Sequence, residues 1–231
     1  MAKKKESADE FFHFPAEALK FLSGLSRNNN KQWYEAHKAD YQKHLLEPLK
    51  DMVAAIGPIL ARKVPGLRAD PRVNGSIFRI NRDTRFSKDK SPYKTHAAAF
   101  MWAGPGEKLA CPGVYFHLDA KELLYGSGLY MFAPESLGFY RRFVAEKGGE
   151  LARAVKKAEK AGFELGGEKL KKVPSGFPPD HEHAELLKMK GFHVMKTYPA
   201  KKVTEGDLIG WLVKEIEPSL DVIKTLEKAI F

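Results

Sequence analysis

The densest cluster of charge in this 231-residue sequence lies between Arg72 and Lys94. These 23 residues contain seven cations and two acidic residues, and so carry half of the net charge of +10. Three of the arginines follow one another at a spacing of three residues, close to Phe78 and Phe86. Since a guanidinium group presents a planar pair of donors that fits a carboxylate or a phosphate, the segment predicts a site for an anion. The candidate ligand-binding residues are Arg79, Arg82, Asp83, Arg85, Lys90, Tyr93 and Lys94.

Asp83 lies among these arginines, where it has two candidate roles. It could orient one guanidinium group through a bidentate pair, or it could act as a base. The alternative is a structural network, in which the charged side chains pair with one another and pin a long loop to a sheet. The excess of cations over acidic residues favours the anion site, because internal pairing leaves cations without partners.

His117 is the second candidate for acid–base chemistry. It alternates with Tyr115 and Asp119 on one face of a predicted strand. Across a hairpin this face could meet Gly126 and Gly128, whose missing side chains allow a ligand or another backbone to approach. The simpler interpretation is a surface-facing strand with a bulge at the glycines.

Other common motifs are missing from the sequence. It contains no phosphate-binding glycine loop, dinucleotide fingerprint, nucleophile elbow or H-E-x-x-H helix. The pair His181 and His183 has no third ligand placed beside it, so we expect no metal and no cofactor. His96 precedes a run of alanines and is interpreted as a packed or capping histidine. Cys111 has no neighbour that would activate it as a nucleophile.

The central motif resembles the hallmark of an uncharacterised bacterial family, a domain of unknown function of about this length. That hallmark is R-x-x-R-D-x-R-F, followed by D-K and then P-Y-K. It is matched here by Arg79, Arg82, Asp83, Arg85, Phe86, Asp89, Lys90, Pro92, Tyr93 and Lys94. Asn28, Asn29 and Trp33, and the stretch from Gly126 to Gly128, extend the resemblance over roughly residues 11–203. No activity is established for that family, so the resemblance implies a family and no function.

Composition restricts the class of protein. Hydrophobic residues make up 43% and charged residues 29%, which is typical of a globular chain. A single cysteine excludes an intramolecular disulfide, and no run approaches the roughly 18 apolar residues of a membrane helix. The lysines of the N-terminus are followed by no apolar segment, so we expect no signal peptide and a cytoplasmic protein without membrane contact.

The positive charge favours anionic partners, either a small molecule or a nucleic acid. A second basic cluster could extend a nucleic-acid track, although a solvated helix face explains it more simply. Its members are Arg153, Lys156, Lys157, Lys160, Lys169, Lys171 and Lys172.

Apolar periodicity predicts the elements that position these residues. Helices are expected over residues 16–25, after the N-cap candidates Asn28 to Asn30, over 45–61, from Pro134 onward, and from Leu208 to the end, with a bend at Pro218. The pair Gly57 and Pro58 is expected to kink or end the third helix. Strands are expected over 73–78, 95–102, 114–119, 123–132 and 191–198, and a loop over 162–181.

The short connections favour antiparallel pairing. We therefore expect an α+β fold, with an antiparallel meander sheet of about four to six strands in the middle of the chain, flanked by N-terminal and C-terminal helices. Residues 1–10 are interpreted as a flexible tail and 11–231 as a single domain. Three functions stay open: an anionic small-ligand site, with catalysis undecided; a nucleic-acid-binding module; and a structural or partner-binding protein with an internal Arg/Asp network. The oligomeric state is open as well.

Overall fold

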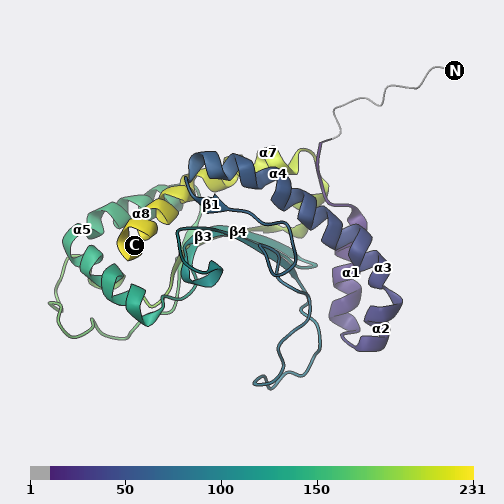
Figure 1. Cartoon of the computed structure of the whole chain (residues 1–231), viewed down its shortest axis with the longest axis horizontal. Coiled ribbons are helices and arrows are strands. Elements are labelled where there is room, and N and C mark those ends of the chain that lie inside the picture. The colour runs from purple at the N-terminus through teal and green to yellow at the C-terminus, as the bar shows by residue number, and fades with distance from the viewer. Residues whose placement is uncertain (1–10) are drawn as a thin grey trace, which may run out of the picture.

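A six-stranded antiparallel sheet forms the middle of the molecule (Figure 1). The computed structural model describes residues 11–231, so the predicted tail lies outside the described residues. The strand order is β1-β2-β3-β4-β6-β5, in which the first four strands form a meander. The strands are β1 (Leu67–Arg68), β2 (Ala97–Ala103), β3 (Gly113–Leu118), β4 (Glu122–Leu129), β5 (Glu164–Gly166) and β6 (Phe192–Pro199). The predicted α+β fold with a central antiparallel sheet is confirmed.

Helices from both ends of the chain cover one face of this sheet (Figure 1). The N-terminal part forms α1 (Ala16–Arg27), α2 (Lys31–Ala36), α3 (Lys38–Asp40), a π-helical segment η1 (Tyr41–Leu46) and α4 (Glu47–Lys63). The C-terminal half forms α5 (Pro134–Lys160), α6 (Ala184–Leu187), α7 (Leu208–Ile216) and α8 (Leu220–Ile230). The 3-10 turns are η2 (Lys108–Ala110), η3 (Ala200–Thr204) and η4 (Glu217–Ser219). No helix within residues 11–231 has both the length and the apolar character needed to cross a bilayer.

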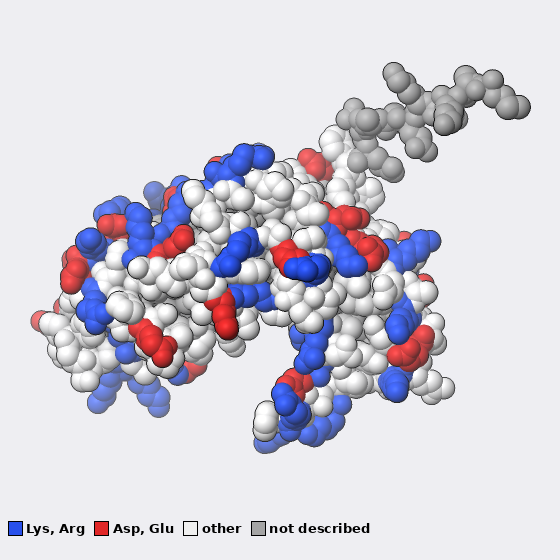
Figure 2. All heavy atoms as spheres, viewed as in Figure 1, with Lys and Arg blue, Asp and Glu red and all other residues white. Residues whose placement is uncertain are grey.

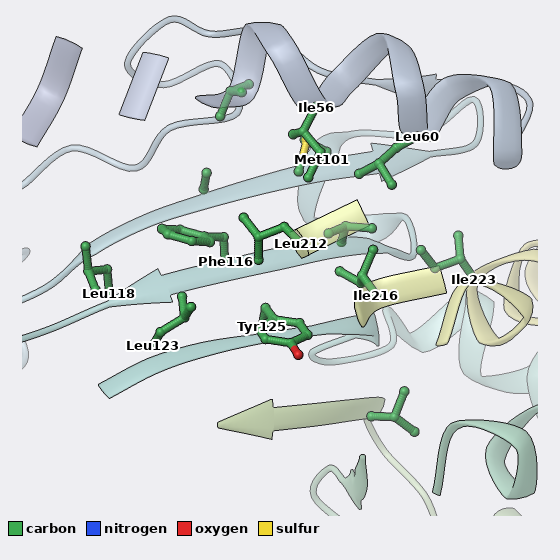
Figure 3. Packing of buried hydrophobic residues seen from close by; sticks show 14 of the residues in the cluster. Ile56, Leu60, Met101, Phe116, Leu118, Leu123, Tyr125, Leu212, Ile216 and Ile223 are labelled. Atoms are coloured by element: carbon green, nitrogen blue, oxygen red, sulfur yellow. The ribbon is translucent and has the colours of Figure 1, made fainter. Parts of the chain in front are cut away.

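The core lies between the sheet and helices α4, α7 and α8. The alternation predicted for β3 is observed, because Val114, Phe116 and Leu118 are all buried. Figure 3 shows Phe116 and Leu118 among apolar side chains from α4, α7 and α8. Burial of this continuous apolar surface is the main stabilising contribution to the fold.

Three consecutive asparagines organise the N-terminal helices. Asn28 is the C-cap of α1 and donates its side-chain amide to the Gly24 carbonyl at 3.0 Å. Asn30 caps α2, accepting a hydrogen bond from the Trp33 amide at 2.9 Å. Asn29 caps neither helix, and its side chain bonds instead to the backbone of a segment 64 residues further along the chain. Of the three predicted N-cap residues, therefore, only Asn30 is an N-cap, while Asn28 caps the C-terminal end of α1.

Two predicted helix breaks have different outcomes. Helix α4 continues through Pro58 to Lys63, so of the two outcomes predicted at Gly57 and Pro58, a kink or an end, the end is wrong. Pro58 and the residue four before it, Ala54, lie on the exposed side of α4, where water can bond the carbonyl that loses its helical donor. The predicted bend at Pro218 is confirmed, since η4 separates α7 from α8.

The strand predicted over residues 73–78 is wrong, because this segment makes only isolated bridges. Asn74 has a φ of 68°, and the Gly75 amide bonds back to the Arg72 carbonyl at 3.0 Å, so the chain turns here. Apolar and polar residues alternate in this turn as they do in a strand, which explains the wrong prediction. Strand β1 precedes this turn, and β5 lies inside the predicted 162–181 loop; both are too short to give a periodic signal.

Candidate functional site

The arginine-rich segment forms a projecting finger, defined here as residues 79–94. It extends away from the sheet on the side opposite α4 and α7 (Figure 1). Its two arms pair near the base, where the Arg82 amide donates to the Pro92 carbonyl at 2.9 Å and the Lys94 amide to the Ile80 carbonyl at 2.7 Å. Lys and Arg side chains gather along it (Figure 2). Most of the predicted charge cluster is therefore a solvated hairpin, while Arg72 lies outside it and pairs with Asp70.

Both acidic residues of the finger are paired within it. Asp83 holds Arg85 in a bidentate pair, with Oδ1–Nε at 3.0 Å and Oδ2–Nη2 at 2.7 Å. The hydrogen bonds from the Arg85 side chain and backbone lower the pKa of Asp83, so this carboxylate is better suited to orient an arginine than to act as a base. Asp89 pairs with Arg82.

Of the other cations of the finger, Lys94 is half-buried at the base, whereas Arg79, Lys88 and Lys90 are exposed. Lys90 donates to the Thr84 carbonyl at 2.9 Å. Arg79 and Lys88 are exposed, and neither makes an ion pair within residues 11–231. The Arg/Asp network is thus internal to the finger, does not attach it to the sheet, and leaves cations free to meet an anion.

The finger is attached to the rest of the protein through Tyr93 and Asn29. The Asn29 side chain donates to the Tyr93 carbonyl at 2.8 Å and accepts from the Tyr93 amide at 3.1 Å. The Tyr93 ring is only 5% exposed and stacks on Tyr34 at a centroid distance of 4.2 Å. Tyr93 is therefore a packing residue at the base of the finger, and the N-N-x-x-x-W and P-Y-K motifs meet in space.

The sheet face opposite the core carries a cavity of about 440 Å³, called here the sheet cavity. Strand register explains its floor, because Phe100, Tyr115, Gly126 and Met195 occupy one row across β2, β3, β4 and β6. The lining is mainly apolar and aromatic. Its residues are Phe78, Lys94, His96, Ala98, Phe100, Leu109, Gly113, Tyr115, Ser127, Gly128, Leu129, Tyr130, His193 and Met195.

A second cavity, of about 500 Å³, lies at the base of the finger and is called here the finger cavity. Asn29, Arg82 and Asp83 contribute to its lining. Lys94 and His96 line both cavities, so they stand at the boundary between the finger and the open sheet face. Arg79, Arg85 and Lys90 line neither cavity. The structure thus divides the predicted ligand residues between a cavity wall and an exposed finger.

His96 was missed as a site residue, and the structure places it against the predicted candidate His117. The two imidazole rings stack at a centroid distance of 4.1 Å. The Tyr115 hydroxyl lies 3.2 Å from His117 Nδ1, and Asp119 is 3.9 Å from His117 Nε2. His96 is packed, as predicted, but it also lines both cavities. Alternation from Ala98 and Phe100 back to His96 is the signal that could have placed it on the cavity face.

Both imidazoles are held in the neutral state. Burial, the neighbouring His117 and Lys94 together lower the pKa of His96 to about 4. Burial also lowers the pKa of His117, partly opposed by Asp119. At neutral pH both rings can therefore accept a proton or a hydrogen bond.

We expect the stability of the protein to fall as the pH drops from about 6.5 towards 4. In this window the unfolded chain binds a proton at His96 that the folded chain does not, so acid favours unfolding. The expected contribution of His96 is about 1–2 kcal/mol, discounted because the ring keeps contact with solvent. His96→Phe keeps an aromatic ring on His117 and removes the titration. Urea unfolding at several pH values should show a shallower acid slope in this variant than in the wild type, and equal slopes would contradict the assignment.

The other sequence candidates have structural roles. Asp119 accepts hydrogen bonds from the Lys121 and Glu122 amides at 2.7 and 2.8 Å and so caps the β3–β4 turn. His181 contacts the Ala145 carbonyl and the His183 amide. Across residues 11–231 no group of three or more His, Cys, Asp or Glu side chains is arranged to hold a metal. Cys111 is buried, and burial raises the pKa of its thiol.

The second basic cluster is partly neutralised. Lys157 pairs with Asp221 at 2.6 Å, and Lys169 pairs with Glu185 at 3.3 Å. These contacts tie α5 to α8 and the 167–183 segment to α6. They support the interpretation of this cluster as a solvated surface.

Comparison with known proteins gives a family and no activity. No curated protein matches the chain. One similar solved structure is titled as an uncharacterized protein from Methanothermobacter thermautotrophicus; it is 12% identical, with 78% of this chain and 99% of that chain covered and a TM-score of 0.34. The family model described as "Conserved hypothetical protein (DUF2461)" matches residues 17–224. Because this match spans the finger, both cavities and nearly all of the sheet and helices, the chain belongs to the DUF2461 family of conserved hypothetical proteins.

Proposed function

We propose that this protein binds a small molecule made of an apolar or aromatic body and an anionic group, a carboxylate or a phosphate. The body occupies the sheet cavity, and the anionic group lies at Lys94. The observation that carries this proposal is the position of Lys94 and His96 on the boundary between the two cavities. A mainly apolar pocket with a few convergent polar groups is the usual form of a small-molecule site.

The charge around Lys94 supports an anion there. Burial and the neighbouring Arg79 lower the pKa of Lys94, which means that its ammonium group lacks stabilising partners. Lys108 lies near the same Phe78 ring, with its Nζ 4.2 Å from the ring centroid against 5.3 Å for Lys94. An anion at this position offsets the repulsion between the cations and the loss of hydration.

His96 supplies the polar chemistry beside that anion, and His117 supports it from behind by stacking on its ring. As a neutral imidazole, His96 accepts a hydrogen bond from a hydroxyl, an amide or a protonated acid of the ligand. The same position would also serve a proton transfer, with His96 as the base. The proposal itself is of binding, and it leaves the reaction open.

Lys94→Met is expected to weaken binding of such a ligand about 10- to 100-fold, because a charge-assisted contact contributes roughly 1.5–3 kcal/mol. The measurement is a thermal-shift and calorimetry panel at constant ionic strength. It contains aromatic carboxylates, sugar phosphates and dicarboxylates, each with a neutral analogue where one exists. A ligand that binds only the folded state raises the melting temperature by mass action.

The matched control is Lys90→Met, a lysine of the finger that lines neither cavity. We expect it to bind the ligand as the wild type does. Equal losses in the two variants would move the site to the exposed finger. Binding of neutral analogues as tightly as the anions, or no binding by any member of the panel, would contradict the proposal.

A further inference from the structure

The finger ends in an exposed aromatic side chain that has no role in the core. Phe86 is 94% exposed at the tip of the hairpin. The Arg85 guanidinium lies 5.7 Å from the centroid of its ring, and Asp83 holds that guanidinium in place. Single exposed apolar side chains are common on protein surfaces. Phe86 differs from them because it stands at the end of a projecting element, next to an oriented arginine.

Cations follow the finger from its base to its tip. The two acidic residues are occupied by Arg82 and Arg85, which leaves Arg79, Lys88 and Lys90 as charges for an outside partner. They lie on both arms of the hairpin, on either side of Phe86. An aromatic ring with cations on both sides matches a chain that repeats a flat base and a phosphate.

We propose that the finger binds single-stranded nucleic acid, with Phe86 stacked on an unpaired base and Arg79, Lys88 and Lys90 beside the phosphates. Stacking on an aromatic face requires an unpaired base, which is why a single strand is favoured over a duplex. A membrane surface fits less well, because Asp83 and Asp89 lie within three residues of the only large apolar side chain at the tip. This inference concerns the finger alone and is independent of the ligand proposed for the sheet cavity.

The test is the fluorescence anisotropy of labelled single-stranded RNA and DNA of roughly 10 nucleotides, a length within the range of single-strand sites. Phe86→Ala is expected to weaken binding roughly 5- to 150-fold, which corresponds to the loss of one base stack. Phe86→Tyr should retain most of the affinity. Since Phe86 is exposed, neither change should lower the melting temperature.

Phe139→Ala is the matched control. Phe139 is also exposed and also has an arginine beside it, since Arg142 lies 4.8 Å from its ring centroid, but it belongs to α5. We expect this variant to bind as the wild type does. Arg79→Gln and Lys88→Gln should each make binding less sensitive to salt. The slope of the logarithm of the binding constant against the logarithm of the salt concentration should become shallower by about 0.7 for each phosphate that the variant no longer neutralises.

Several results would overturn the inference. These are equal affinity of wild type and Phe86→Ala, equal losses in the Phe86 and Phe139 variants, or tighter binding of a duplex of the same length. Binding that disappears at physiological salt also counts against it. A further arm uses vesicles of anionic lipid; Phe86-dependent binding to vesicles without binding to oligonucleotides would assign the finger to membranes instead.

Discussion

Gly128→Ala is expected to destabilise the protein by about 3 kcal/mol or more. Gly128 has a φ of 145°, a conformation that side chains other than glycine rarely adopt. A Cβ at this position would also collide with the Phe192 carbonyl oxygen and the His193 Cα of the neighbouring strand β6. Backbone strain and overpacking each contribute about 1–3 kcal/mol, and here neither can relax without separating two central strands. For a chain of this size the melting temperature should fall by roughly 6–12 °C.

The control is Gly138→Ala, in helix α5. A Cβ at Gly138 meets no atom within 4 Å, so the change is expected to stabilise the helix by about 0.5–1 kcal/mol. Urea unfolding of both variants measures their free energies of unfolding, which should fall for Gly128→Ala and rise for Gly138→Ala. A Gly128→Ala protein as stable as the wild type would mean that β4 and β6 can separate at this position at little cost. It would also reopen the second explanation for this glycine, namely space for a ligand.

The sequence predicted the middle of the fold well and its edges poorly. Residues 114–119 alternate strictly because one face packs on helices and the other lines a cavity, and this pattern located β3. Strands β1 and β5 contain two and three residues, too few for any period to appear. The error at 73–78 has another cause, since a turn set by Asn74 gives the same alternation of residue types as a strand.

The candidate site was predicted in its composition but not in its arrangement. The arginine cluster was identified, and a bidentate pair of Asp83 with one of the arginines was among the roles considered; the structure shows that the partner is Arg85. That the cluster stands on a finger depends on backbone hydrogen bonds between the two arms, and its attachment depends on hydrogen bonds between Asn29 and Tyr93, 64 positions apart. His96 was missed for the same reason, because its stacking on His117 depends on the register between β2 and β3. A single sequence carries the alternation along each strand, and the pairing between strands has to come from the structure.

Glu215→Ala is expected to destabilise the protein by about 2–3 kcal/mol. The Glu215 carboxylate of α7 accepts hydrogen bonds from Lys196 Nζ at 2.8 Å, the Tyr198 hydroxyl at 2.9 Å and the Tyr125 hydroxyl at 3.1 Å. Burial alone would raise the pKa of Glu215, but the hydrogen bonds from Lys196 and Tyr198 outweigh it and lower the pKa. Removing the carboxylate leaves a largely buried ammonium group without its counter-ion, which costs more than the pair contributes. The solvent that still reaches both side chains places the loss below the 3–5 kcal/mol of a fully buried pair.

A double-mutant cycle distinguishes a broken ion pair from a simple loss of packing. Lys196→Met with Glu215→Leu replaces both charges by apolar side chains of similar size, so the double variant should be more stable than Glu215→Leu alone. Because the pKa of Glu215 is lowered by folding, its contribution is present above the pKa of the unfolded chain and is lost as the pH falls through the folded pKa. The difference between wild type and Glu215→Ala should therefore shrink in acid. Additive losses in the cycle, or a difference that is constant with pH, would show that α7 is held to β4 and β6 by its apolar contacts, and that this carboxylate contributes little to the attachment.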